Sequence, residues 1–214
     1  MVAWMRLKYP HLVNGAWASS APVNAQIDFL EYKEVMTEGI TRIGGDECAA
    51  TFENAFKQLE EIVDEGNTTK LYVALRLCGP LNLTKDAAHM FYELSDIVAG
   101  LVQTHRPGNI EGACDYLQRE KEMNNATDFE AFAAWVNRGN LMCLDLSYQN
   151  SVRKFRDVTW GSEANRQMRQ WTYQTCSEFA WFQTSTSPNQ IFGSPPMYPV
   201  DYFVKICEDL YDYK

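Results

Sequence analysis

The residues best suited to chemistry gather in one stretch of the chain, W-T-Y-Q-T-C-S-E at residues 171–178. Two aromatic side chains, a cysteine and a carboxylate lie close together there. Trp171, Tyr173 and Thr175 alternate with polar residues, a spacing that predicts a short strand with one aromatic face. Such a face could line a pocket for an apolar ring, or it could belong to an ordinary half-buried strand that ends in a disulfide.

The chain contains no complete motif for hydrolytic chemistry. No serine lies in G-x-S-x-G or a close variant, and Ser19 and Ser20 stand in A-S-S-A without the glycines of a nucleophile elbow. His11, His89 and His105 have no nucleophile and no orienting acid placed beside them. We therefore interpret the histidines as structural or solvated and predict no catalytic residue within the chain.

Metal and nucleotide sites lack their signatures as well. The sequence contains no H-E-x-x-H pair, no calcium loop and no C-x-x-C pair. Gly44 and Gly45 stand without the motif that cradles phosphate, and Glu53, Glu60 and Glu61 fall on the polar side of a predicted helix. We predict no cofactor and no bound metal.

Composition limits the class of partner. The chain has 214 residues, 46% of them hydrophobic, which is enough for a sizeable core. A net charge of −9 argues against nucleic acid or an anionic membrane as partner, since both attract clustered Lys and Arg. No apolar run is long enough for a transmembrane helix, and residues 1–13 do not read as a signal peptide.

The cysteines indicate an oxidising compartment. Their number is even and none has the spacing of a zinc site, so disulfides are the better interpretation, with the pairing left open by the sequence. Sequons at Asn67, Asn82 and Asn125 favour the same compartment. We expect a secreted or lysosomal protein whose signal peptide belongs to a segment before Met1.

Four segments of the chain resemble one enzyme family. RQWTYQTCSEFAWFQTS at residues 169–185 resembles the hallmark segment of the family of lysosomal Pro-X carboxypeptidase, dipeptidyl peptidase II and thymus-specific serine protease. Residues 1–23 are similar to the segment that follows the nucleophile in that family, and LCGPLNLT at 77–84 and NIEGACDYL at 109–117 match it too. The run CSEFAWFQTS is most similar to the thymus-specific branch.

The resemblance implies an α/β fold, a partial α/β-hydrolase core that carries a large, mainly α-helical inserted domain. Residues 1–27 would be the core piece after the nucleophile elbow, residues 28–165 the helical insert, and residues 166–214 the return to the core. Cys48 would pair with Cys114, Cys78 with Cys143, and Cys176 with Cys207.

The same resemblance implies a serine exopeptidase acting on proline-containing peptides. The family uses Ser, Asp and His in that order; by this alignment Ser lies just before Met1 and the other two follow Lys214. A non-catalytic truncated relative that acts as a binding protein is the alternative, and a homodimer is one possible assembly. Trp171, Thr172 and Tyr173 would line the substrate pocket, with Thr172 where the dipeptidyl peptidase branch has an acidic residue that holds the substrate amine.

Periodicity and capping residues predict mainly helices. Pro10 should end a first helix, Gly66 should stop a helix that begins at Asp46, and Thr84 and Thr127 should cap two more. The expected helices cover residues 1–9, 46–65, 84–104, 112–119, 128–137 and 200–211. We further predict a buried strand at residues 15–20, a polar surface connection at 147–169, and at 184–198 a loop that borders the binding site.

Overall fold

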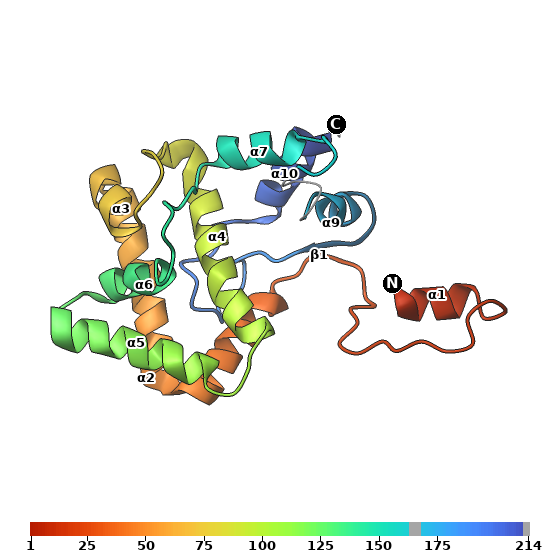
Figure 1. Cartoon of the computed structure of the whole chain (residues 1–214), viewed down its shortest axis with the longest axis horizontal. Coiled ribbons are helices and arrows are strands. Elements are labelled where there is room, and N and C mark those ends of the chain that lie inside the picture. The colour runs from red at the N-terminus through yellow and green to blue at the C-terminus, as the bar shows by residue number, and fades with distance from the viewer. Residues whose placement is uncertain (163–167, 212–214) are drawn as a thin grey trace.

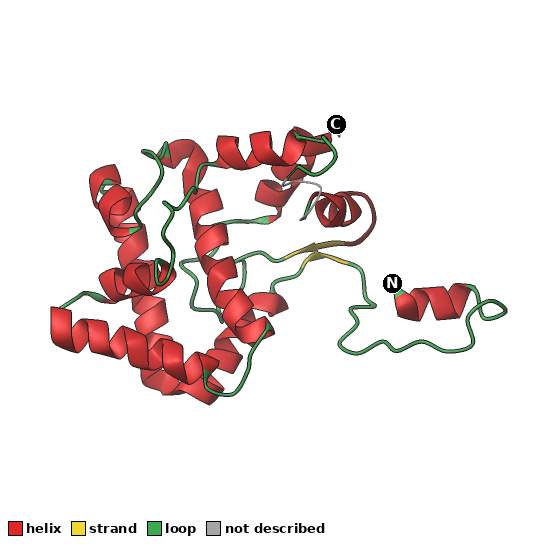
Figure 2. Cartoon of the chain, in the orientation of Figure 1, coloured by secondary structure: helices red, strands yellow, loops and turns green. Residues whose placement is uncertain are grey.

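The computed structural model describes residues 1–162 and 168–211. This part of the chain is mostly helical, with one small parallel strand pair (Figure 2). The helix-rich α/β fold predicted from the sequence is therefore confirmed. The elements are α1 (Val2–Lys8), β1 (Gln26–Asp28), α2 (Glu31–Asp64), α3 (Thr68–Ala74), α4 (Leu83–Gln103), α5 (Asn109–Asn124), α6 (Asp128–Val136), α7 (Tyr148–Arg156), α9 (Arg169–Gln174), the π-helix η1 (Thr175–Phe179), β2 (Ala180–Phe182) and α10 (Val200–Tyr211).

The core lies among α2, α4, α5 and α6, which form the body on the left of Figure 1. Phe56 stands at its centre, with ring centroids of Phe132, Phe192 and Phe91 at 5.3, 5.5 and 6.2 Å. These rings are fully buried, as the apolar stripes of α2 and α4 require. The helical body therefore shares one hydrophobic core with the C-terminal part of the chain, which contributes Phe192.

Helix α2 is longer than the sequence indicated. The predicted helix at residues 46–65 is its second half, and Gly45, with φ of 84°, kinks the chain between the two halves. Only glycine adopts that conformation at little cost. The first half, which buries Lys33, Met36 and Ile40, was not predicted.

Helix starts agree with the sequence where a complete cap is present. Thr127 and Glu130 form a capping box at α6, as expected from Thr127. At α4 the predicted cap, Thr84, is wrong by two residues: Asn82 is the N-cap, and its backbone N–H donates to Asp86 Oδ2 at 2.8 Å. Asp86 therefore fixes the start of α4 from within the helix.

The predicted strand at residues 15–20 is wrong. This segment is irregular and Trp17 is exposed, because no described segment lies beside it to share backbone hydrogen bonds. The first strand is instead β1, which pairs in parallel with β2, Gln26 opposite Ala180 and Asp28 opposite Phe182. Pairing brings the start of the chain against its C-terminal part.

The predicted strand at residues 171–175 is also wrong, because this segment forms α9 and enters η1. Its hydroxyls bond along the helix: Thr172 Oγ1 donates to Met168 O at 2.8 Å, and Thr175 Oγ1 to Thr172 O at 2.9 Å. Local bonds of this kind satisfy Ser and Thr without a neighbouring strand. The alternation of aromatic and polar residues was therefore a misleading signal.

Two further predicted segments differ from expectation: the described part of residues 147–169, of which 163–167 lie outside the described residues, and the loop at 184–198. The polar connection contains α7, capped by Ser147. The loop at 184–198 does not line the cleft described below but is inserted into the core, with Phe192 and Tyr198 fully buried. Its backbone is held there by Ser185 Oγ, which accepts from Met197 N at 2.9 Å and Tyr198 N at 3.0 Å.

A buried lysine joins this loop to two helices. Lys33 Nζ on α2 donates to Ser95 Oγ on α4 at 2.9 Å, and Ser95 Oγ lies 2.9 Å from Tyr198 OH. The ammonium also lies 5.2–5.9 Å from the ring centroids of Phe192, Tyr32, Tyr198 and Tyr92. Burial lowers the pKa of Lys33 to about 8, against the opposing effect of Asp96.

Three disulfides join the pairs that the resemblance implied: Cys48–Cys114, Cys78–Cys143 and Cys176–Cys207. The first ties α2 to α5, and the third ties η1 to α10. Cys78 and Cys143 lie beside the bridge between Leu77 and Leu144. Restricting the unfolded chain in this way stabilises a fold by about 2–4 kcal/mol per bond.

The division into residues 1–27, 28–165 and 166–214 stays a prediction. Its first boundary falls inside β1, and its second lies outside the described residues. Of the helices that the structure describes, none combines the length and the apolar character needed to cross a bilayer.

Gly44 provides a test of close packing at the first disulfide. A Cβ added there would lie 2.5 Å from Cys114 Sγ and 3.1 Å from Cys48 Sγ, so Gly44→Ala should lower the free energy of unfolding by about 1–3 kcal/mol. Gly112→Ala meets nothing within 4 Å and should be neutral or slightly stabilising. Urea unfolding with the disulfides intact compares them, and equal stability would contradict this packing.

Lys33 provides a test of burial. Above pH 8 the folded chain releases a proton that the unfolded chain still holds, so stability should rise with pH up to about 9.5, at no more than about 1.4 kcal/mol per pH unit. Lys33→Met should remove this rise, whereas Lys57→Met, at an exposed lysine of the same helix, should keep it. Urea unfolding across this pH range measures both, and a rise that survives in Lys33→Met would contradict the assignment.

Candidate functional site

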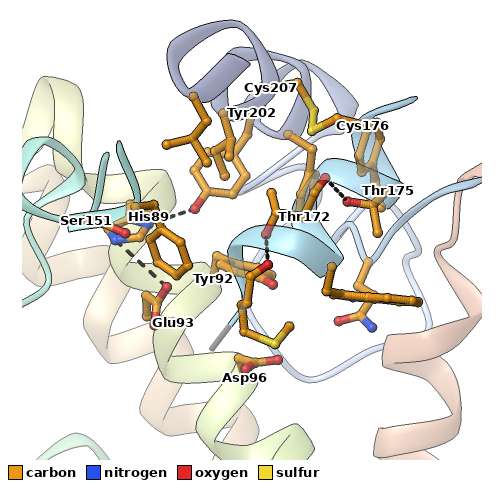
Figure 3. A pocket seen from close by; sticks show the side chains of 18 of the residues that line it. His89, Tyr92, Glu93, Asp96, Ser151, Thr172, Thr175, Cys176, Tyr202 and Cys207 are labelled. Atoms are coloured by element: carbon orange, nitrogen blue, oxygen red, sulfur yellow. Dashed lines mark hydrogen bonds and ion pairs between the residues drawn. A yellow bond between two sulfur atoms is a disulfide. The ribbon is translucent and has the colours of Figure 1, made fainter. Parts of the chain in front are cut away.

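A cleft of about 640 Å³ opens between α4 and α7 on one side and α9, η1 and β2 on the other (Figure 3). Helix α10 completes its lining with Tyr202, Phe203 and Cys207. The Cys176–Cys207 disulfide belongs to the wall and fixes η1 against α10. The cleft therefore lies where the helical body meets the C-terminal part of the chain.

One wall is a stack of aromatic rings. Trp181 lies 4.7 Å from Phe179, 5.9 Å from Trp171 and 6.0 Å from Trp4, centroid to centroid, and all three pairs are close to parallel. The contacts of Trp4 with Trp181 and Phe179 also attach α1 to the rest of the molecule. Trp171 and Trp181 line the cleft and present a broad apolar surface to it.

The backbone of this wall is unusual. Ala180 and Trp181 both have positive φ, 57° and 51°, directly after the π-helix. Both features are energetically unfavourable for ordinary residues and recur at functional sites. Trp181 Nε1 donates to Asn24 O at 2.6 Å, and the β1–β2 pairing begins at Ala180. These contacts hold the strained segment in place.

The sequence-predicted pocket residues take different positions. Trp171 and Thr172 lie in the lining of the cleft, together with Thr175 and Cys176, which recur one helical turn later. Tyr173 lies outside the lining, edge-to-face with Tyr211 at 5.3 Å. The helical form of this segment separates Tyr173 from its neighbours, whereas the predicted strand placed it beside Trp171. That these residues contact a substrate stays a prediction.

The opposite wall carries polar residues that sequence reasoning missed. His89, Glu93 and Asp96 occur at i, i+4 and i+7 on α4, which places them on one face of the helix, and all three line the cleft. His89, interpreted from the sequence as structural or solvated, is only 4% exposed. Its Nδ1 lies 2.7 Å from Tyr202 OH, and its Nε2 lies 3.9 Å from Glu93 Oε1. The sequence did contain a signal for these residues, because they recur at helical spacing on a helix whose other residues are largely apolar.

Burial shapes the charges on this wall. It lowers the pKa of His89 to about 4, although Asp86 and Asp145 act in the opposite direction, so the imidazole is neutral near pH 7. Glu93 keeps 42% of its side chain exposed, yet desolvation and then the Asp96 charge raise its pKa to about 7. Asp96 is exposed, yet partial desolvation raises its pKa too, and the Lys33 charge partly offsets this rise.

Comparison with known proteins identifies the chain. A family model described as serine carboxypeptidase S28 matches residues 1–214. The chain belongs to this peptidase family. It is 32% identical to the thymus-specific serine protease of Homo sapiens and 31% identical to that of Mus musculus, each alignment covering 99% of this chain and 43% and 44% of the relative.

The lysosomal Pro-X carboxypeptidase of Homo sapiens is a more distant S28 relative. It is 24% identical over 83% of this chain and 37% of its own length. The chain thus spans less than half the length of these curated relatives.

Residues considered for S28 chemistry from the sequence lie apart from one another. Ser19 and Ser20 are exposed in the irregular segment before β1, where Ser19 Oγ accepts from Trp17 Nε1 at 2.6 Å. His11 is exposed and His105 half-buried, and neither lines the cleft. Asn67, Asn82 and Asn125 of the sequons are all exposed. Among the described residues, no group of three or more His, Cys, Asp or Glu could hold a metal ion.

The acidic pair on α4 should be visible in a titration. Glu93 should titrate near pH 7, and Asp96→Asn should lower its pKa, because the Asp96 charge disfavours ionisation of Glu93. Carboxyl ¹³C NMR measures this, with Glu93→Gln to assign the resonance. Glu61→Gln removes an exposed carboxylate outside the cleft and should leave the pKa unchanged. The proposed environment would be contradicted if Glu93 had an ordinary pKa that did not change in Asp96→Asn.

Proposed function

We propose that this chain is part of a serine-type peptidase that removes residues from a terminus of proline-containing peptides. The observation that carries the proposal is the match of the S28 model along the whole chain. A cleft with an aromatic wall supports it, because flat aromatic surfaces suit a proline ring. One relative is named a Pro-X carboxypeptidase, which agrees with a preference for proline in the substrate.

Catalysis is assigned to residues outside these 214. The sequence contains no nucleophile elbow, and the resemblance of residues 1–23 to the segment after the nucleophile supports a position for the serine before Met1. The Asp and His of the triad are assigned to sequence after Lys214. In this proposal the chain supplies a wall of the substrate cleft, while the serine that attacks the peptide comes from elsewhere in the protein.

We further propose that the protein is secreted or lysosomal. Three disulfides require an oxidising compartment to form, and exposed sequons agree with passage through the secretory pathway. One relative is named lysosomal.

Serine labelling tests the proposal directly. A fluorophosphonate should label the protein encoded by the complete transcript, at a serine in a G-x-S-x-G-like context, and should leave the 214-residue chain unlabelled. A label on this chain mapped to Ser19 or Ser20 would contradict the assignment of the nucleophile. A complete protein that is neither labelled nor hydrolytic would favour the alternative, a non-catalytic binding protein.

Two aromatic residues of α9 form a matched pair for testing the cleft. In the complete enzyme, Trp171→Ala should lower kcat/KM for a proline-containing peptide about ten-fold, because it removes apolar surface from the lining. Tyr173→Ala should leave kcat/KM close to the wild-type value, since Tyr173 packs edge-to-face on Tyr211 outside the lining. Equal losses in the two variants would show that Trp171 acts through stability alone.

A further inference from the structure

We propose that the α4 wall of the cleft binds a cationic group of the peptide, an ammonium or a guanidinium, between Glu93, Asp96 and the aromatic rings around them. The proposal rests on the proposed function only in taking a peptide as the ligand. It names a substrate class, peptides that carry a positive charge close to the residue held by the aromatic wall.

Among the described residues, no lysine or arginine forms an ion pair with Glu93 or Asp96, although Lys154 and Lys33 act on them at longer range. Among the contacts of the described residues, Asp96 has no ion pair or hydrogen bond, and Glu93 has only His89 Nε2 at 3.9 Å. Lys154, the basic residue of the lining, lies 3.4 Å from Asp145. Lys33 is fully buried and directed at Ser95. Two carboxylates, of which Asp96 is exposed, therefore line the cleft without a basic partner among the described residues, and an external cation would supply one.

The buried imidazole of His89 is a second indication of a ligand. His89 is only 4% exposed, and its Nδ1 is within hydrogen-bond distance, 2.7 Å, of Tyr202 OH. Its Nε2 faces the cleft, but at 3.9 Å from Glu93 Oε1 it is beyond hydrogen-bond distance. A gap of this length between two polar groups fits a bridging polar group. Because the imidazole is neutral, it does not repel a cation placed there.

The balance of charge and the aromatic rings favour the same ligand. Among the described residues of the lining, Glu93, Asp96 and Asp145 outnumber the one basic residue, Lys154, so this part of the cleft attracts cations. Tyr92, which directly precedes Glu93 on α4, and Trp171 on α9 both line the cleft and offer rings to an ammonium or guanidinium.

The described residues of α9, η1 and β2 that line the cleft carry no charge. Thr172 is neutral and its hydroxyl donates to Met168 O at 2.8 Å. Recognition of the cation is thus assigned to α4, and recognition of an apolar ring to α9 and β2. The two walls face each other across the cleft, as Figure 3 shows for Asp96 and Thr172.

The test measures binding to the 214-residue chain by isothermal titration calorimetry at pH 8, where Glu93 is ionised. The probes are alanyl-prolyl-alanyl-alanine, its N-acetylated form, and the acetylated peptide with lysine in place of the first alanine. A peptide with a cation should bind at least about ten-fold more tightly than the neutral acetylated peptide. Preference for the first probe assigns the site to a terminal amine, and preference for the third assigns it to a basic side chain.

Variants assign the effect to the α4 wall. Glu93→Gln combined with Asp96→Asn should bring the affinity for the cationic peptide down to that of the neutral one. Glu61→Gln, an exposed carboxylate outside the cleft, removes one charge and should change nothing. Near-UV circular dichroism checks that each variant folds. If the double variant does not fold, the comparison of the three peptides on the wild-type chain still tests the proposal.

Equal affinities for charged and neutral peptides, wild-type affinity in the double variant, or no binding of any probe would each overturn the proposal. These outcomes leave the serine peptidase assignment untouched, since that assignment is judged by fluorophosphonate labelling. Conversely, charge-dependent binding in a protein that no fluorophosphonate labels would overturn the peptidase and retain the cation site.

Discussion

The Lys33–Ser95–Tyr198 contact is the interaction on which the arrangement of the cleft depends. It joins α2, α4 and the loop at residues 184–198, which are far apart in sequence. Removing an ammonium from water is costly, and the surrounding rings and the Ser95 hydroxyl offset part of that cost only in this one geometry. The contact also fixes the rotation of α4 about its own axis. With Ser95 held in the core, the nearby positions Glu93 and Asp96 of the same helix face the cleft.

The opposite wall is fixed by different means. The segment from Thr175 to Phe182 combines a π-helix with two residues of positive φ, so it would not hold this form as an isolated peptide. The Cys176–Cys207 disulfide fixes one end to α10, and the β1–β2 pair fixes the other to the beginning of the chain. The aromatic stack thus remains in place although its backbone is strained. Such strain lowers stability, so a role of this segment in binding explains it better than a role in folding does.

The sequence predicted the fold where local physics and packing agree. The stripes of α4 and α10 and the capping box at Thr127 specify helices from a few neighbouring residues. It failed where distant partners decide. Residues 15–20 have strand-like composition but no strand beside them, and residues 171–175 alternate like a strand but bond within a helix. The π-helix, the kink at Gly45 and the burial of the 184–198 loop follow from contacts that no local pattern encodes.

The two walls of the cleft differ in the same respect. Trp171 and Thr172 were found because they belong to a contiguous motif, whereas His89, Glu93 and Asp96 lie about 80 residues earlier and face them only after folding. Each wall taken alone has an ordinary explanation, as packed aromatics or as a solvated polar row. In the site we propose, the two walls face each other and one recognises a ring while the other recognises a charge. That division lets binding energy come from two chemically different groups of one peptide, and it is independent of the serine that the family uses for hydrolysis.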